Sequence, residues 1–160
     1  MPRDDERFMR EALELAEGAE GAGEVPVGAV IVHSGRVVGR GANRQIRDND
    51  PTAHAEIVAL RQAALELGDF RLREATAYST LEPCAMCAGA LVTARLKRLV
   101  FGSRDLRFGA VRSKFRVADS ELLNHRLEVT EGVLAAECVA LLRSFFALRR
   151  SPVGPSAQLP

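Results

Sequence analysis

Hydrophobic residues recur at helical spacing in several stretches of the chain, and Gly or Pro stands at the boundaries of these stretches. In the first, Met9, Ala12 and Leu13 follow the 3.6-residue period of an amphipathic helix. In the second, Gly68 follows the last apolar position, which is typical of a helix C-terminus. The pattern predicts helices over residues 8–20, 53–67, 84–93 and 133–149.

Short apolar runs rich in β-branched residues lie between these helices. Residues 26–32 form one run, residues 33–36 turn the chain, and Val37 begins the return, which predicts a β-hairpin. Three more strands are predicted over residues 76–80, 99–102 and 127–130. Residues 41–52 are polar and predict a loop, and residues 103–119 have no clear period.

Strands alternate with helices after the initial hairpin, which predicts an α/β domain with helices on both faces of a mixed five-stranded sheet. The chain has 160 residues, the size of one ordinary domain, and it shows no internal repeat or boundary. We therefore expect one domain over residues 1–150. Residues 151–160 contain three prolines and are predicted to be a disordered tail.

Composition places the chain among soluble globular proteins, with 47% hydrophobic and 27% charged residues. No apolar run approaches the roughly 20 residues of a membrane span. Residues 1–7 are too charged to begin a secretory signal, so a cytoplasmic location is expected and no membrane partner. Three cysteines, an odd number, argue against a disulfide framework.

Positive charge is concentrated in one segment, although the formal net charge of the chain is only +1. Between residues 95 and 116 eight basic residues stand against one acid, Asp105. Such a stretch can be a solvated surface or an electrostatic footprint for phosphate groups. The basic residues are Arg95, Lys97, Arg98, Arg104, Arg107, Arg112, Lys114 and Arg116.

Two short segments carry the candidate chemistry, and each lies where the chain enters a predicted helix. The first contains His54 and Glu56, and the second contains Cys84 and Cys87. Zinc accepts imidazole and thiolate ligands, and a catalytic zinc site keeps one of its four positions open for water. We predict zinc ligation by His54, Cys84 and Cys87. Glu56, in the first turn after His54, can then act as the base.

Other interpretations of the same residues exist. A C-x-x-C pair can be a redox centre, but the upstream His-x-Glu favours a metal. A structural zinc site needs a fourth protein ligand. The candidates are His33 in the predicted hairpin turn, His125 in a predicted loop and Cys138 on an apolar helix face. We expect these three at the surface, in a loop and in the core, respectively.

The combination of His-x-Glu with Pro-Cys-x-x-Cys is the signature of zinc nucleobase deaminases. From about residue 8 to residue 150 the chain also resembles the bacterial tRNA-specific adenosine deaminases. The resemblance implies a cytidine deaminase-like α/β/α fold, one zinc ion per subunit and a homodimer. It also implies conversion of adenosine to inosine at the wobble position of a tRNA anticodon stem-loop. The matching segments are 24–30, 43–44, 50–56, 80–89, 101–105, 124–126, 131–134 and 145–150.

The resemblance assigns roles around the target base by matching position. Asn43 is expected to hydrogen-bond the flipped base, with help from the backbone of Ala55. The carbonyl group of Glu82 is expected to lie near the departing ammonia. The walls of the base pocket are expected to be Pro26, Val27 and Gly28.

The resemblance further implies contacts to the rest of the RNA. Asp105 is expected to touch the sugar beside the target, and Phe145, Arg149 and Arg150 to touch the anticodon loop. Residues 106–110, Leu-Arg-Phe-Gly-Ala, depart from the family pattern. Arg107 keeps the positive charge of the family there and is expected to contact the RNA, whereas Phe108 is bulky where the family has a small residue.

Two other functions remain open at this stage. One is deamination of a free base such as guanine or cytosine, whose enzymes share both metal motifs. The Phe-Phe-x-x-Arg-Arg ending at residues 145–150 argues for the tRNA enzyme. The other is a non-catalytic RNA-binding module, and the intact Glu56 argues against it.

Overall fold

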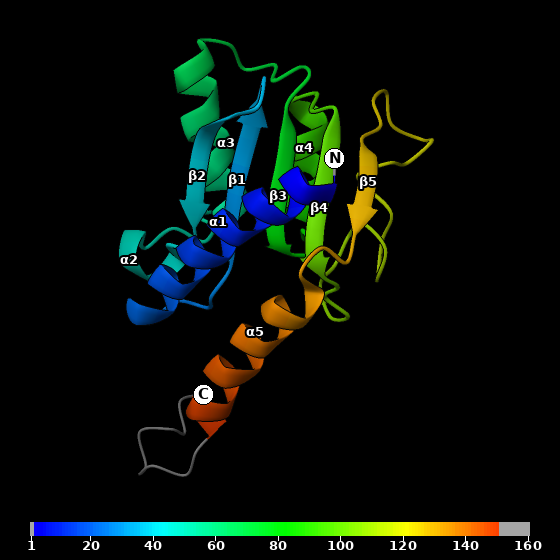
Figure 1. Ribbon diagram of the computed structural model, residues 1–160. Coiled ribbons are helices and arrows are strands. Elements are labelled where there is room, and N and C mark those ends of the chain that lie inside the picture. Colours follow the sequence, from blue (N-terminus) through cyan, green and yellow to red (C-terminus); the bar gives the residue numbers. More distant parts are fainter. Residues whose placement is uncertain (1, 151–160) are drawn as a thin grey trace.

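Five strands form one mixed sheet in the computed structural model, which describes residues 2–150 (Figure 1). Its strand order is β2-β1-β3-β4-β5. β1 pairs antiparallel with β2 and with β3, whereas β3, β4 and β5 run parallel to one another. The mixed five-stranded sheet is therefore confirmed. The strands are β1 (Gly28–His33), β2 (Arg36–Ala42), β3 (Thr76–Leu81), β4 (Arg98–Ser103) and β5 (Glu128–Glu131).

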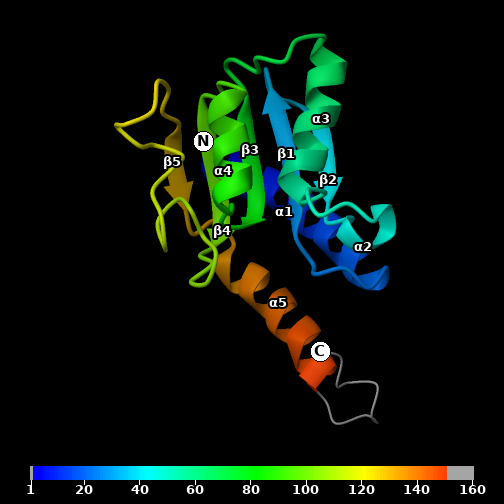
Figure 2. The same ribbon diagram turned by 180° about the vertical axis from the view of Figure 1, so that it is seen from behind.

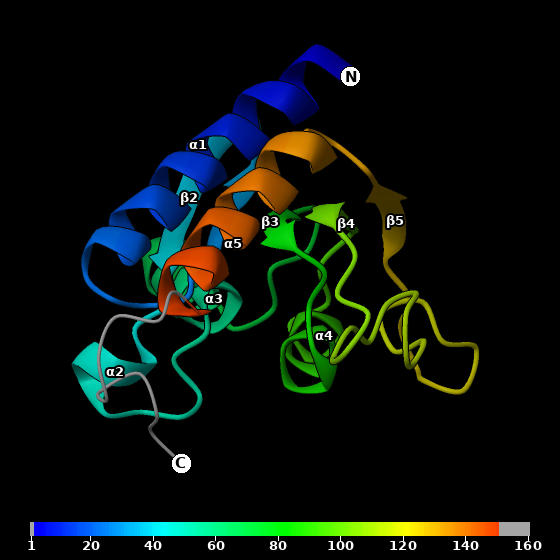
Figure 3. The same cartoon turned by 90° about the horizontal axis from the view of Figure 1, so that it is seen from below.

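Helices cover both faces of this sheet, as the alternating pattern predicts. α1 (Pro2–Gly21) and α5 (Ala135–Arg150) lie side by side on one face (Figure 3). α3 (Ala55–Leu67) and α4 (Ala85–Thr93) lie on the other (Figure 2). A fifth helix, α2 (Gln45–Asp48), is a single helical turn between β2 and α3. Within residues 2–150, no helix is long and apolar enough to cross a membrane.

The two-residue period of the strands supplies a core for each face of the sheet. Ile31 and Phe101 point into the cluster beneath α3 and α4. Their neighbours Val30 and Val100 point into the second cluster, beneath α1 and α5. β1 and β4 are buried on both sides, which explains why they read as continuous apolar runs rather than alternating ones.

Close packing of α3 on β2 brings the start of that helix against the sheet. A Cβ atom at Gly41 would collide with the carbonyl oxygen of Ala55, the first residue of α3. Gly39 faces the carbonyl oxygen of Ala59 one turn later in the same way. These glycines let the backbone of α3 lie directly on β2, and this fixes where the helix begins.

Most helices and strands begin and end within two residues of the sequence-based expectations, and two differences are larger. α1 begins at Pro2 rather than near Phe8, because Asp5 is buried and ion-paired with Arg98 on β4. α2 interrupts the predicted loop 41–52, because the buried Glu24 carboxylate accepts hydrogen bonds from the N–H groups of Ile46 and Arg47. The predicted disordered tail, residues 151–160, lies outside the described residues.

Candidate active site

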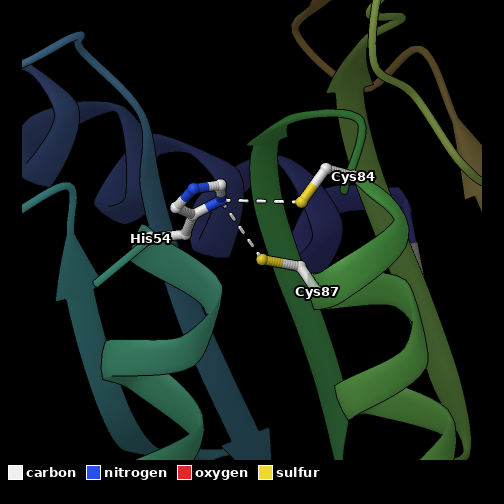
Figure 4. A group of neighbouring side chains, drawn as sticks. All are labelled: His54, Cys84 and Cys87. Carbon is white, nitrogen blue, oxygen red and sulfur yellow. Dashed lines mark hydrogen bonds between the residues drawn. The ribbon is translucent and has the colours of Figure 1, made fainter. Parts of the chain in front are cut away.

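His54, Cys84 and Cys87 converge at the starts of two helices (Figure 4). His54 stands immediately before α3 and Cys84 immediately before α4, both with extended backbone, and Cys87 lies in the first turn of α4. Neither His54 nor Cys84 caps its own helix with its side chain. All three side chains therefore point toward one another instead of back to the backbone.

The distances between the ligand atoms suit a tetrahedral metal. His54 Nδ1 lies 3.6 Å from Cys84 Sγ and 3.5 Å from Cys87 Sγ. Tetrahedral zinc, with its usual bond lengths to nitrogen and sulfur, separates two such ligands by about 3.6 Å. Because both sulfur atoms already stand at this separation from the imidazole nitrogen, the site fits zinc with a fourth position left free.

The charge state of the thiols also suits a metal, because thiolate is the form that binds. Cys87 donates a hydrogen bond to Cys84, and this bond, together with His54, lowers the pKa of Cys84 to about 4. The same bond, together with burial, raises the pKa of Cys87. The hydrogen bond with Cys84 also raises the pKa of His54. The pair therefore already carries one negative charge beside the imidazole.

Glu56 lies beside this cluster in the first turn of α3, with 5% of its surface exposed. Burial raises the pKa of its carboxyl group to about 7, and the negative charge of Cys84 acts in the same direction. The side chain is thus enclosed next to the metal ligands but is not one of the three clustered donors. This placement is the one expected of a proton-transfer group.

Asn43, in the loop after β2, is held on two sides beside the start of α3. Its Nδ2 group donates to the Val25 carbonyl oxygen at 3.0 Å, and its Oδ1 atom accepts from the Ala55 N–H at 2.9 Å. Its own N–H donates to the Val27 carbonyl oxygen. An amide has two N–H groups and two lone pairs, so one of each stays available to a base. The N–H of Ala55 thus orients Asn43, and the backbone of Ala55 lies beside the side chain that is expected to bind the base.

The expected pocket wall, Pro26, Val27 and Gly28, is buried between Asn43 and the sheet. Gly28 donates its N–H to Thr80 Oγ1 on β3. A side chain at position 28 would collide with the Ala12 carbonyl oxygen of α1. Gly28 thus permits α1 to pack directly behind this wall.

Glu82 has a structural role that the sequence did not reveal. Its buried carboxylate accepts hydrogen bonds from the N–H groups of four residues and from one hydroxyl group. Burial opposes ionisation, but these bonds outweigh it and lower the pKa of Glu82 below its ordinary value. The donors are the N–H groups of Asp105, Val111, Arg112 and Ser113, and the Ser113 hydroxyl.

The loop that Glu82 holds returns directly to the metal ligands. Gly109 forms an isolated antiparallel bridge with Cys84, and the N–H of Ala110 donates to the Pro83 carbonyl oxygen. Asp105 and Arg107, two of the expected RNA contacts, therefore lie in a loop that is tied to the metal centre.

Comparison with known proteins agrees with this geometry. Residues 2–103 match the family described as the cytidine and deoxycytidylate deaminase zinc-binding region. A tRNA-specific adenosine deaminase of Haemophilus influenzae is 54% identical over 91% of this chain and 85% of its own. The chain belongs to the tRNA-specific adenosine deaminases of this zinc-dependent family.

Solved structures of deaminases share the fold. One, from a study of A-to-I editing by tRNA deaminases at the wobble position, superposes with a TM-score of 0.82. It is 44% identical and covers 85% of this chain and 99% of its own. A guanine deaminase from Nitrosomonas europaea has a TM-score of 0.78 and 28% identity, covering 89% of this chain and 84% of its own.

Most of the basic stretch of this deaminase is neutralised by acidic partners. Five of its eight basic residues form ion pairs. Among the ion pairs of residues 2–150, none includes Arg95, Arg107 or Lys114. The positive charge left for phosphate groups is therefore much smaller than the +7 counted along the sequence. Of the three basic residues without an ion pair in residues 2–150, Arg107 lies in the loop that is bridged to Cys84. The paired residues are Lys97, Arg98, Arg104, Arg112 and Arg116.

The C-terminal helix of the deaminase contacts the loop after α1. Arg149 donates to the Gly23 carbonyl oxygen at 2.9 Å, and its guanidinium lies 4.0 Å from the centre of the Phe145 ring. Phe145 is only 5% exposed, whereas Phe146 is 43% exposed. Direct stacking of RNA on Phe145 is therefore not supported, and the accessible ring of this helix is that of Phe146. Arg150 is exposed.

The remaining histidines and the third cysteine lie outside the metal cluster of residues 2–150. Cys138 is buried in the core beneath α1 and α5, as predicted. His125 contacts the Leu96 carbonyl oxygen at 2.6 Å, and it is part of the loop before β5, also as predicted. His33 ends β1 and contacts Ser34 at the edge of the hairpin turn.

Proposed function

We propose that this enzyme converts adenosine to inosine at the wobble position of a tRNA anticodon. The observation that carries the proposal is the cluster of three zinc ligands with the buried Glu56 and Asn43 at the start of α3, in a chain 54% identical to a tRNA-specific adenosine deaminase. Adenosine and water give inosine and ammonia, so the reaction needs a nucleophile, a proton carrier and a group that holds the base.

Zinc, when bound, lowers the pKa of a coordinated water molecule to about 7 and so supplies a nucleophile near neutral pH. Glu56 takes the proton that water gives up and delivers protons to the purine ring nitrogen and to the leaving amine. Its burial beside the ligands keeps it within the pocket and away from bulk water. Asn43 offers its remaining N–H and lone pair to the edge of the base and so orients it.

The peptide backbone around Glu82 serves the leaving group in this proposal. The Glu82 carbonyl group lies directly before Pro83 and Cys84 in the chain, where it can accept a hydrogen bond from the departing ammonia. The carboxylate of the same residue keeps the surrounding loop in place. One residue thus contributes to both the pocket and the RNA-facing loop.

The RNA must present the adenosine outside a base stack, because C6 is hidden in a duplex. Asp105 is proposed to accept a hydrogen bond from a ribose 2′-hydroxyl group. Arg107, Arg149 and Arg150 are proposed to contact phosphates, so binding is expected to weaken with salt at a slope near −0.7 per contacted phosphate. Phe145 is proposed to act indirectly, by supporting Arg149 from beneath.

The enzyme is further proposed to act as a homodimer in the cytoplasm. The support for the dimer is the family resemblance, and the support for the location is the substrate, since bacterial tRNA is a cytoplasmic molecule. Sedimentation equilibrium of the zinc-loaded protein measures the first. A monomer that is fully active on RNA would contradict it.

Guanine deamination is the competing function, because a guanine deaminase shares this fold. The deciding experiment offers the zinc-loaded enzyme an anticodon stem-loop with adenosine at the wobble position, and in parallel free guanine and free adenosine. A stem-loop with the same adenosine moved into the paired stem is the matched control. We expect inosine only in the loop substrate. Comparable turnover of free guanine would favour the competing function.

A further inference from the structure

Phe108 displays a large aromatic surface to solvent in the loop after β4. Its side chain is 65% exposed. Isolated exposed apolar residues are common and need no special explanation. Phe108 differs because the loop around it is held in place and because of where that loop lies.

Hydrogen bonds within the loop fix the direction in which Phe108 projects. Asp105 Oδ1 accepts from the N–H of Arg107 at 3.0 Å and from the N–H of Phe108 at 3.2 Å. The N–H of Gly109 donates to the Asp105 carbonyl oxygen at 2.9 Å. The N–H of Asp105 is itself held by the buried Glu82 carboxylate. The ring of Phe108 is therefore presented on an ordered turn.

This turn lies against the metal centre. Gly109, the residue after Phe108, forms its bridge with the zinc ligand Cys84. A side chain at Gly109 would collide with the Glu82 carboxyl group, so close approach of the turn depends on this glycine. An RNA whose target base enters the pocket must place the neighbouring nucleotides near this turn.

Positive charge accompanies the ring. The Arg107 guanidinium lies 5.9 Å from the centre of the Phe108 ring, within the range of a cation–π contact. Since Arg107 has no acidic partner among the ion pairs of residues 2–150, its charge is available to a phosphate group. An aromatic face with an adjacent free cation is the combination that binds single-stranded nucleic acid by stacking.

We propose that Phe108, with Arg107 beside it, is the surface on which the base of a nucleotide adjacent to the target adenosine stacks. This inference rests on the proposed function. Extruding the target base exposes one face of its neighbour, and stacking that face on Phe108 offsets part of the unstacking cost. Phe108 thus helps to choose the loop adenosine and takes no part in the chemical step.

The first test compares Phe108→Ala and Phe108→Trp on the anticodon stem-loop. We expect Phe108→Ala to raise KM about tenfold with kcat little changed, because stacking contributes mainly to binding. Phe108→Trp retains a stacking surface and is expected to keep KM within about twofold of the original. Unchanged KM in Phe108→Ala would overturn the inference.

Phe70 supplies a matched control. It is 68% exposed and has Arg71 over its ring at 4.6 Å, but it follows the C-terminal end of α3, away from the metal ligands. Phe70→Ala is expected to leave KM unchanged. If Phe70→Ala raised KM as much as Phe108→Ala, the loss of any exposed aromatic side chain would have this effect. That result would overturn a specific role for Phe108.

The second test identifies the stacked base by a double-mutant cycle. Stem-loops lacking the base on the 5′ or the 3′ side of the target are assayed with the original enzyme and with Phe108→Ala. Removing the stacked base is expected to abolish the effect of Phe108→Ala at one of these positions. Full additivity at both positions would overturn the inference.

Two further outcomes are distinguishable. If the original enzyme does not deaminate the wobble adenosine, the proposed function fails and this inference fails with it. If Phe108→Ala instead dissociates the protein in sedimentation equilibrium, the ring packs against a second copy of the chain and the stacking role is wrong.

Discussion

The N–H of Ala55 donates a hydrogen bond to Asn43 Oδ1 over 2.9 Å, so α3 begins on a side chain from the loop after β2. His54 occupies the position where Ser, Thr, Asp or Asn usually caps a helix, but its ring faces Cys84 and Cys87 instead. Asn43 therefore satisfies the first of the helix N–H groups that have no partner within the helix. The same amide faces the base pocket, so helix start and substrate contact are coupled.

Asn43→Ala is expected to lower both stability and activity. The substitution removes the acceptor for the buried N–H of Ala55, which costs about 1–3 kcal/mol of the free energy of unfolding. It also removes the donor and acceptor offered to the base, so KM for the stem-loop should rise. Urea unfolding and steady-state kinetics measure the two effects. Asn124→Ala, at an exposed position, is the control. Unchanged unfolding in Asn43→Ala would show that this bond contributes nothing.

Cys87→Ser is expected to reduce the zinc content well below one ion per chain. The serine hydroxyl is a poor replacement for a thiolate ligand, and the remaining two ligands do not complete a zinc site. Metal analysis after dialysis gives the occupancy. Cys138→Ala removes a buried thiol on the opposite face of the sheet and is expected to keep zinc. Full occupancy in Cys87→Ser would remove Cys87 from the ligand set.

Glu56→Gln is expected to keep zinc and the fold while losing activity by at least 10²–10⁴-fold, the usual contribution of a general acid–base group. Glutamine matches the size of glutamate but carries no proton between water and the base. Metal analysis, thermal unfolding and single-turnover deamination separate these properties. Glu66→Gln, an exposed position on the same helix, serves as the control. A Glu56→Gln enzyme of near-normal rate would rule out the proton-transfer role.

Glu82→Gln is expected to release the loop that contains Asp105 and Ser113. The glutamine amide replaces one acceptor oxygen by an NH₂ group, which cannot accept hydrogen bonds from the surrounding N–H groups. The expected loss is on the order of 2–3 kcal/mol of the free energy of unfolding. Hydrogen exchange of the N–H groups of residues 111–113 should become faster. Gly109→Ala, which forces a side chain against Glu82, should act in the same direction. Gly18→Ala, where nothing obstructs a side chain, is the control. Unaltered exchange in Glu82→Gln would contradict the anchoring role.

Stability should depend on pH through Asp5. Burial raises the pKa of Asp5, but hydrogen bonds from Arg98 and Tyr78 outweigh burial and lower it below its ordinary value. Ionised Asp5 therefore stabilises the fold above an unfolded-state pKa of about 3.9, and this contribution disappears as the pH falls through the lower folded-state pKa.

Asp5→Asn tests this dependence. We expect it to lower the free energy of unfolding by about 1.5–3 kcal/mol at pH 7. The difference from the original protein should shrink as the pH is lowered toward 3, and Asp4→Asn, at an exposed neighbour, should show neither effect. A difference that stayed constant with pH would contradict the role of the ionised carboxylate.

Local patterns were enough to predict most of the secondary structure and the metal ligands. Apolar periodicity depends on which face of a helix or strand is buried, and this is why α3, α4 and β3 appear close to their predicted positions. Imidazole and thiolate groups are common zinc ligands, so His54, Cys84 and Cys87 were identifiable from residue type and order.

Contacts between residues distant in the sequence decided the rest. Glu24 stabilises α2 from 22 and 23 residues away, and Asp5 joins α1 to β4 through a bond that spans 93 residues. A carboxylate such as Glu82 has the same sequence appearance whether it faces water or five donors, because its environment is assembled only when the sheet and loop fold. The burial of Phe145 and the exposure of Phe108 also depend on tertiary structure. The residues next to each phenylalanine in the sequence do not determine whether its ring is buried.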